Sequence, residues 1–331
     1  MHTNNNAMGL DVGTSRIVTA KPKTEGYEFN SQLNAFVTIP YSKLTERVLD
    51  KEGVPHSING SQIVVHGNES EKFADLMDTE IRRPMTGGVL DAKEPESISM
   101  MREIIGSLLD KNNADKPMVC FTVPAASLDS SESLTYHEAT VKQILTQLGY
   151  ENRAVNEGLA VVYAELESTN YTGIGISCGG GLCNVCYSYL SVPVVTFSIP
   201  KAGDYIDANA ASMTGERANR IRLAKEEAFH FNGFFSDKVQ QVISVYYDDM
   251  IKSLVAGMKE AFGDARHMPK LNRAVPLVLS GGTAMPKGFR DRFEKIFNES
   301  NLPIQVSEVR MASNPLEAAA KGALVAALAE M

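Results

Sequence analysis

The stretch that decides the fold is AMGLDVGTSRIV, residues 7–18. A short apolar run leads into a glycine-containing turn, and β-branched residues resume after it, which predicts a strand–turn–strand hairpin. The same pattern returns in GIGISCGGGLCNV, residues 173–185. A third apolar run with glycines, VPLVLSGGT at residues 275–283, leads instead into a helix, because phenylalanines recur every four residues from 289 to 297.

The two hairpins lie about half a chain apart and can be overlaid. Gly9 then falls on Gly175, Asp11 on Ser177 and Gly13 on Gly179. This overlay indicates an ancient duplication in which one hairpin opens each half of the chain.

The segments between the hairpins alternate between two periodicities. Residues 118–124 read as a buried strand, and residues 131–148 follow as an amphipathic helix with apolar side chains on one face. The alanine-rich stretch 315–331 predicts a C-terminal helix with proline in its first turn. Strands that alternate with helices indicate an α/β protein, and 331 residues suggest about two domains.

Composition excludes several classes of function. The chain has 32 Lys and Arg against 40 Asp and Glu, a net charge of −8, which argues against nucleic-acid binding and against attraction to anionic lipid. No run of eighteen apolar residues or signal-like start is present, so we expect no membrane insertion. Four cysteines in a chain of this length predict a cytoplasmic protein with reduced thiols.

The glycine turns predict a phosphate site. A turn without Cβ atoms lets backbone amides approach a ligand, and consecutive N–H groups form a concave anion site. Any one such turn is equally well explained as a tight hairpin, but three after apolar strands favour nucleotide binding. Asp11 precedes the first turn and is placed to hold Mg²⁺ through water, although an aspartate there could also simply stabilise the turn.

These segments resemble the actin-like ATPase superfamily, which includes actin, MreB, MamK, FtsA and the large heat-shock chaperones. DVGTS at 11–15 matches the first phosphate loop, and SGGTAMPKGF at 280–289 is very close to the adenosine motif of actin. Residues 156–164 and 317–323 resemble the two connecting helices. The segment RRPMTGGVLD at 82–91 is similar to one in MreB, so the chain resembles the MreB/MamK-like bacterial actins most.

The resemblance implies a two-domain α/β fold, each half a mixed sheet with flanking helices around a nucleotide cleft. Domain I would span residues 1–153, with a small subdomain at about 32–82. Domain II would span residues 154–331, and the C-terminal helix would return to domain I. MreB-like proteins carry a larger insertion in the second half than this chain has room for, so we expect a reduced small subdomain at about 208–240.

The resemblance also implies ATP or ADP with Mg²⁺ in the cleft, and Asp11 as the residue that holds the metal. The nucleotide-binding residues would be Asp11, Gly13, Thr14, Ser15, Arg16, Gly179, Gly180, Gly181, Asn219, Arg222, Gly281, Gly282 and Thr283.

Hydrolysis in the family depends mainly on positioning and charge. A polar residue on the helix after the second core strand orients the attacking water, and Glu138 is the first candidate here, with His137 next. Either residue could equally belong to the solvated face of that helix. Glu157, at the first connecting helix, is the second catalytic candidate.

One departure from the family concerns hydrolysis. Ser177 stands where the second phosphate loop normally has an acidic residue, and the internal overlay places it opposite Asp11. Serine adds no negative charge to hold Mg²⁺ or polarise water, so we expect ATP to bind and to be hydrolysed slowly.

Two functions remain open at this level. The first is a cytoskeletal ATPase that assembles nucleotide-dependent filaments by self-association. The second is a non-polymerising ATP-binding adaptor of the FtsA or pilus-assembly type, which would dock a protein partner. An iron–sulfur site on Cys178, Cys183 and Cys186 has the right spacing, but the glycines between them are better explained by phosphate binding.

Overall fold

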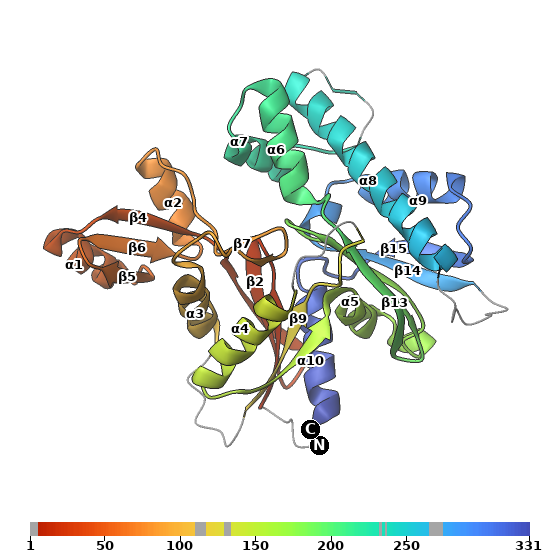
Figure 1. The fold of residues 1–331 in the computed structure, drawn as a ribbon, viewed down its shortest axis with the longest axis horizontal. Coiled ribbons are helices and arrows are strands. Elements are labelled where there is room, and N and C mark those ends of the chain that lie inside the picture. The colour runs from red at the N-terminus through yellow and green to blue at the C-terminus, as the bar shows by residue number, and fades with distance from the viewer. Residues whose placement is uncertain (1–5, 110–116, 129–133, 232–233, 236, 265–273) are drawn as a thin grey trace.

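The computed structural model describes residues 6–109, 117–128, 134–231, 234–235, 237–264 and 274–331. Within these residues the chain forms two five-stranded mixed sheets with helices around them (Figure 1). Two smaller sheets, one of three strands and one of two, belong to the first half. The α/β class expected from the sequence is confirmed.

The first sheet has the strand order β10-β9-β1-β2-β3. Its strands are β1 (Ala7–Val12), β2 (Arg16–Pro22), β3 (Tyr27–Leu33), β9 (Met118–Val123) and β10 (Glu151–Asn156). The hairpin of β1 and β2 is antiparallel, whereas β1 and β9 run parallel. The helices α3 (Ser97–Leu108) and α4 (Leu134–Gln147) bury apolar side chains against one face of this sheet.

The second sheet repeats that topology. Its order is β13-β12-β11-β14-β15, with the strands β11 (Gly173–Cys178), β12 (Cys183–Tyr189), β13 (Val192–Ile199), β14 (Val275–Ser280) and β15 (Val306–Met311). Again the hairpin is antiparallel and its first strand runs parallel to a later one. This equivalence of strand order is what the overlay of the two glycine hairpins predicts.

Two connecting helices lie side by side between the sheets, α5 (Glu157–Glu165) and α10 (Ala318–Glu330) (Figure 1). Each packs on a glycine at the equivalent position of a central strand. A Cβ atom on Gly9 would lie 2.1 Å from the carbonyl oxygen of Ala320 in α10, and one on Gly175 would lie 2.4 Å from that of Gly158 in α5. The strand glycines therefore serve helix packing.

The first half carries a separate three-stranded sheet, β4-β6-β5. Its strands β4 (Phe36–Pro40), β5 (His56–Asn59) and β6 (Gln62–His66) pack with α1 (Lys43–Glu52) and α2 (Glu69–Leu76) around a small apolar core. The short hairpin of β7 (Met85–Thr86) and β8 (Val89–Leu90) follows. It leads the chain back towards the first sheet.

In the second half the corresponding position holds helices, α6 (Gly203–Thr214) and α7 (Ala218–Glu227). They pack with the long helix α8 (Lys238–Asp264). Between Ile199 and Val275 the described residues contain no strand, and residues 232–233 and 236 of the expected reduced subdomain lie outside them. The helix α9 (Phe289–Glu299) buries Phe289, Phe293 and Phe297, in the phase that the sequence predicts.

Among the described residues, no helix combines the length and the apolar character needed to cross a bilayer.

Candidate nucleotide site

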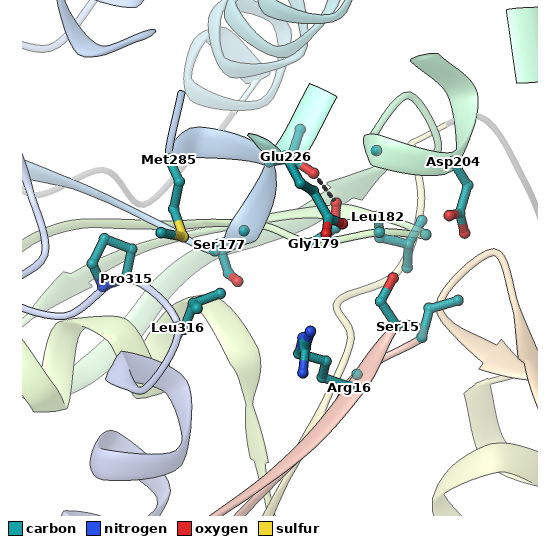
Figure 2. A pocket seen from close by; sticks show the side chains of 18 of the residues that line it. Ser15, Arg16, Ser177, Gly179, Leu182, Asp204, Glu226, Met285, Pro315 and Leu316 are labelled. Atoms are coloured by element: carbon teal, nitrogen blue, oxygen red, sulfur yellow. Dashed lines mark hydrogen bonds between the residues drawn. The ribbon is translucent and has the colours of Figure 1, made fainter. Parts of the chain in front are cut away.

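A cavity of about 410 Å³ lies between the two halves. This volume is in the range of small-molecule sites. Turns from both hairpins line it, together with the loop after β14, α7, and Glu157 at the start of α5. In Figure 2, Ser15 and Arg16 face Gly179, Leu182 and Asp204 across the cavity.

The first hairpin turn is closed by hydrogen bonds within the first half. The backbone N–H of Gly13 donates to the carbonyl oxygen of Arg16 at 3.0 Å, and the Asn34 amide donates to the carbonyl oxygen of Gly13 at 2.9 Å. A Cβ atom on Gly13 would lie 2.7 Å from the Arg16 carbonyl oxygen. Gly13 is therefore required by the turn itself.

The second turn has the same local geometry. The N–H of Gly179 donates to the carbonyl oxygen of Leu182 at 2.9 Å. The start of α6 is attached to this turn, because Gly203 N–H donates to Gly179 O at 3.1 Å and Asp204 N–H donates to Gly180 O at 2.8 Å.

The two turns touch each other. A Cβ atom on Gly181 would lie 2.4 Å from the backbone nitrogen of Gly88 and 2.6 Å from Thr14 Oγ1. Thr14 Oγ1 also accepts a hydrogen bond from Gly88 N–H at 3.1 Å. The glycines of the second turn thus let it approach the first hairpin and the β7–β8 turn without side chains in between.

The loop after β14 closes the opposite end of the cavity. Gly281 has φ +90°, and a Cβ atom there would lie 2.3 Å from the Cys178 carbonyl oxygen, so only glycine fits. The Thr283 hydroxyl donates to Gly179 O at 2.7 Å, which joins this loop to the second hairpin turn. Figure 2 shows Met285, Pro315 and Leu316 at this end, an apolar wall that suits the face of a nucleobase.

Two carboxyl groups lie at the bottom of the cavity. The Thr122 hydroxyl donates to Asp11 Oδ1 at 2.7 Å, and the Asn184 amide donates to Glu157 Oε2 at 2.7 Å. Burial raises the pKa of Asp11 to about 6. Burial, with the nearby Asp11, raises the pKa of Glu157 to about 8. Both groups favour a cationic neighbour, since positive charge would restore their ionised forms.

The donor set fits Mg²⁺ held largely through water and phosphate. Among the described residues no cluster of three or more His, Cys, Asp or Glu side chains could enclose a metal ion. Mg²⁺ commonly binds through one or two carboxylates and keeps several waters. Asp11 would hold the ion in this way.

The structure brings most of the predicted site residues to the cavity. These are Asp11, Gly13, Thr14, Ser15, Arg16, Glu157, Gly179, Gly180, Gly181, Arg222, Gly281, Gly282 and Thr283. Ser177 also lines it and is buried. Asn219 is not among the lining residues, although Arg222 on the same helix is.

Glu138 is not at the cavity either. It forms an ion pair of 2.5 Å with Lys142, one turn along α4, and neither residue lines the cavity. His137, the second candidate, is buried, and its Nδ1 accepts a hydrogen bond from Leu90 N–H at 3.3 Å. Burial lowers the pKa of His137 to about 4, so the ring is neutral near pH 7.

Sequence reasoning missed several polar residues of the second half that line the cavity, among them Asp207, Lys225 and Glu226. Lys225 Nζ lies 2.7 Å from Asp207 Oδ1 and donates to Gly203 O at 3.1 Å, so it ties α7 to the start of α6.

The family model named Volactin matches residues 6–327. The chain belongs to the Volactin family. No curated protein matches this chain.

Solved structures show the same fold at low sequence identity. A MamK double helical filament matches with a TM-score of 0.72 and 19% identity, covering 98% of each chain. MreB5 of Spiroplasma citri bound to AMPPNP matches with a TM-score of 0.66 and 14% identity, covering 95% of this chain and 93% of that one. The ethanolamine utilization protein EutJ from Carboxydothermus hydrogenoformans has a TM-score of 0.58 at 15% identity, covering 96% and 89%. This Volactin-family chain therefore has the fold of the actin-like ATPases.

Proposed function

We propose that this protein binds ATP or ADP with Mg²⁺ in its cleft and assembles into nucleotide-dependent filaments. The observation that carries the proposal is the convergence of two glycine turns and the Gly281–Thr283 loop on one cavity with Asp11 and Glu157 at its base. The similar MamK structure is a filament, and another MamK structure, of a non-polymerising mutant, is bound to AMPPNP. These relatives agree with the proposal.

Each residue group would have a separate role in holding the nucleotide. Backbone amides of the two turns would bind the phosphates, with the Thr14 and Ser15 hydroxyls and Arg16 beside them. The loop at Gly281–Thr283 and the apolar wall at the other end would hold the nucleoside. When bound, Mg²⁺ would neutralise phosphate charge.

Slow hydrolysis follows from the residues around Glu157. Its carboxyl group accepts from Asn184 and lies beside Ser177, a neutral residue that cannot add charge. A cation bound nearby would favour the ionised form of Glu157, which suits a residue that accepts a hydrogen bond from water and orients it. Because Glu138 is paired with Lys142 away from the cavity, we assign this role to Glu157.

A non-polymerising adaptor is the second candidate. It is favoured by Ser177 and by the helical second-half subdomain without strands in the described residues. For either function we place the protein in the cytoplasm, where its four buried free cysteines would stay reduced.

Sedimentation with and without ATP and Mg²⁺, followed by negative-stain electron microscopy, tests the proposal. We expect filaments that pellet only with nucleotide. A protein that binds ATP but stays in the supernatant over a range of salt concentrations would favour the adaptor. The charge of −8 per subunit opposes assembly, so salt or Mg²⁺ should promote pelleting.

A further inference from the structure

A short segment, residues 313–317, separates the nucleotide cavity from a second cavity. Its residues Pro315 and Leu316 line the nucleotide cavity, at the end where the apolar wall lies (Figure 2). The other three residues of the segment line a second cavity of about 170 Å³, together with residues of β3. None of residues 313–317 is buried. Because the segment has a cavity on each side, packing of side chains does little to fix its position, and hydrogen bonds must do so.

One side of the segment is bonded to the loop after β14. The carbonyl oxygen of Pro315 accepts from Gly281 N–H and from the Ser280 hydroxyl, each at 2.9 Å. Gly281 is the residue with φ +90° at the start of the loop that we assign to the nucleoside. The position of Pro315 is therefore linked directly to that loop.

The other side of the segment is held by Glu165, the last residue of α5. Its carboxylate accepts from Ser313 N–H through Oε1 and from the Ser313 hydroxyl through Oε2, each at 3.1 Å. The Glu165 side chain is 4% exposed, and Arg310 Nη1 lies 2.7 Å from its Oε2. Hydrogen bonds to a carboxylate are stronger than those between neutral groups, so Glu165 is a strong anchor for Ser313.

The end of α5 that carries Glu165 is itself fixed. Lys321 Nζ of α10 donates to Ala164 O at 2.9 Å, and Arg310 Nη2 donates to Glu165 O at 2.7 Å. Basic side chains that bind the last carbonyls of a helix stabilise its C-terminal end. Glu157 lies at the other end of the same nine-residue helix. One helix thus carries both the carboxyl group at the base of the cavity and the carboxylate that holds the wall of the nucleoside end.

We propose that Glu165 is a positioning residue for the nucleoside. By holding Ser313, it keeps Pro315 and Leu316 in place as the wall against which the base lies. Glu165 does not line the nucleotide cavity, so it acts on nucleoside affinity without touching the ligand and does not contribute to phosphate binding. The inference on affinity rests on the proposed function, whereas the position of the wall is tested without nucleotide.

Binding of two ligands separates a positioning role from general damage. With Mg²⁺ present, Glu165→Ala should weaken ATP binding by about tenfold, the scale of one hydrogen bond to a charged group, and should change binding of inorganic tripolyphosphate by less than about twofold. Glu167→Ala, at an exposed position two residues further on, is the matched control and should leave both affinities unchanged. An equal loss for both ligands in Glu165→Ala, or no loss for ATP, would overturn the proposal.

A double-mutant cycle tests whether Glu165 acts through Ser313. Ser313→Ala removes one of the two hydrogen bonds and should weaken ATP binding by about threefold. Added to Glu165→Ala, it should have no further effect, because the hydroxyl has already lost its acceptor. Effects that multiply independently would contradict the route through Ser313.

Hydrogen exchange of the ligand-free protein tests the position of the wall. The Gly281 N–H, which is bonded to Pro315 O, should exchange about fivefold faster in Glu165→Ala than in the wild type or Glu167→Ala, because local opening becomes easier. Equal exchange in all three proteins would overturn the positioning role. If the wild type binds no nucleotide, the proposed function fails, but exchange at Gly281 still decides whether Glu165 positions Pro315.

Discussion

Asn184 of β12 joins Glu157 of α5 to the loop after β9. Its side-chain Nδ2 donates to Glu157 Oε2 at 2.7 Å, and its side-chain Oδ1 accepts from Ala125 N–H at 2.9 Å. The residue therefore connects the second hairpin to the first connecting helix and to the first half. It holds the Glu157 carboxyl group at the base of the cavity, where burial raises the pKa of that group to about 8.

The raised pKa of Glu157 predicts a pH-dependent stability of the ligand-free protein. In the folded state Glu157 keeps its proton up to about pH 8, whereas in the unfolded chain it loses the proton near the ordinary glutamate pKa of 4.5. The folded state then binds more protons, so stability falls as pH rises through this window. Between pH 7 and 8.5 we expect a loss of roughly 1 kcal/mol per pH unit, since one pKa unit is worth about 1.4 kcal/mol.

Urea unfolding at pH 7.0 and 8.5 measures this loss. The window lies above the titration of Asp11 and Asp207, whose pKa values burial raises to about 6, and of His137, whose pKa is lowered to about 4. Glu157→Gln should lose less stability over the same interval. Equal slopes for the wild type and the variant would contradict the assignment.

A carboxylate placed at position 177, which is equivalent to Asp11 in the first hairpin, should raise ATP turnover. Ser177 is buried at the cavity beside Glu157. With Mg²⁺, Ser177→Asp should increase steady-state turnover by about tenfold, which corresponds to about 1.4 kcal/mol of the barrier. Ser177→Asn is the matched neutral control and should remain near the wild type. Unchanged turnover in the aspartate variant would count against a charge deficit at this site.

Gly181 tests the contact between the two glycine turns. A Cβ atom there would meet the Gly88 backbone nitrogen at 2.4 Å, which cannot move aside as a flexible side chain would. Gly181→Ala should separate the turns and weaken nucleotide binding by about tenfold, or about 1.4 kcal/mol. On Gly179, in the same turn, the nearest atom would be 3.2 Å away, so Gly179→Ala should have a smaller effect. Fluorescence titration would show the order, and a reversed order would refute the contact.

A substitution at the point where the two connecting helices cross tests the packing of the fold. A Cβ atom on Gly322 of α10 would lie 1.7 Å from the carbonyl oxygen of Ala160 in α5. Gly322→Ala should destabilise the protein by about 3 kcal/mol, as overpacking of a close contact does. Gly263→Ala, in α8 with open space around it, should instead stabilise by roughly 0.5–1 kcal/mol. Thermal unfolding of both variants should give shifts of opposite sign, and shifts of one sign would contradict this packing.

The sequence predicted the positions of the glycines better than it predicted which polar residues on the helices are buried. Residues 9–13 and 175–179 could be overlaid because each central strand needs a glycine where a connecting helix packs on it. Glu138 and His137 could not be separated, because a helical pattern shows which positions are apolar but not which polar neighbour is buried. In the structure His137 is buried and Glu138 pairs with Lys142.

Contacts between distant segments explain what sequence reasoning missed. Lys225 and Asp207 are eighteen residues apart on different helices, and no local spacing in the sequence predicts that they pair. They become cavity residues because α6 is hydrogen-bonded to the second glycine turn and Lys225 ties α7 to α6. The pairing of Glu71 with Arg222, 151 residues away, has no local signal either.

Equilibrium binding of ATP with Mg²⁺ to the purified protein tests the central claim most directly. Titration calorimetry should show one nucleotide per chain. Gly282 also lines the cavity, and a Cβ there would meet only Leu316 Cδ2 at 3.5 Å, so Gly282→Val should weaken binding while the circular dichroism spectrum stays that of the wild type. A wild-type protein that binds no adenine nucleotide would contradict the claim that the cleft is a nucleotide site.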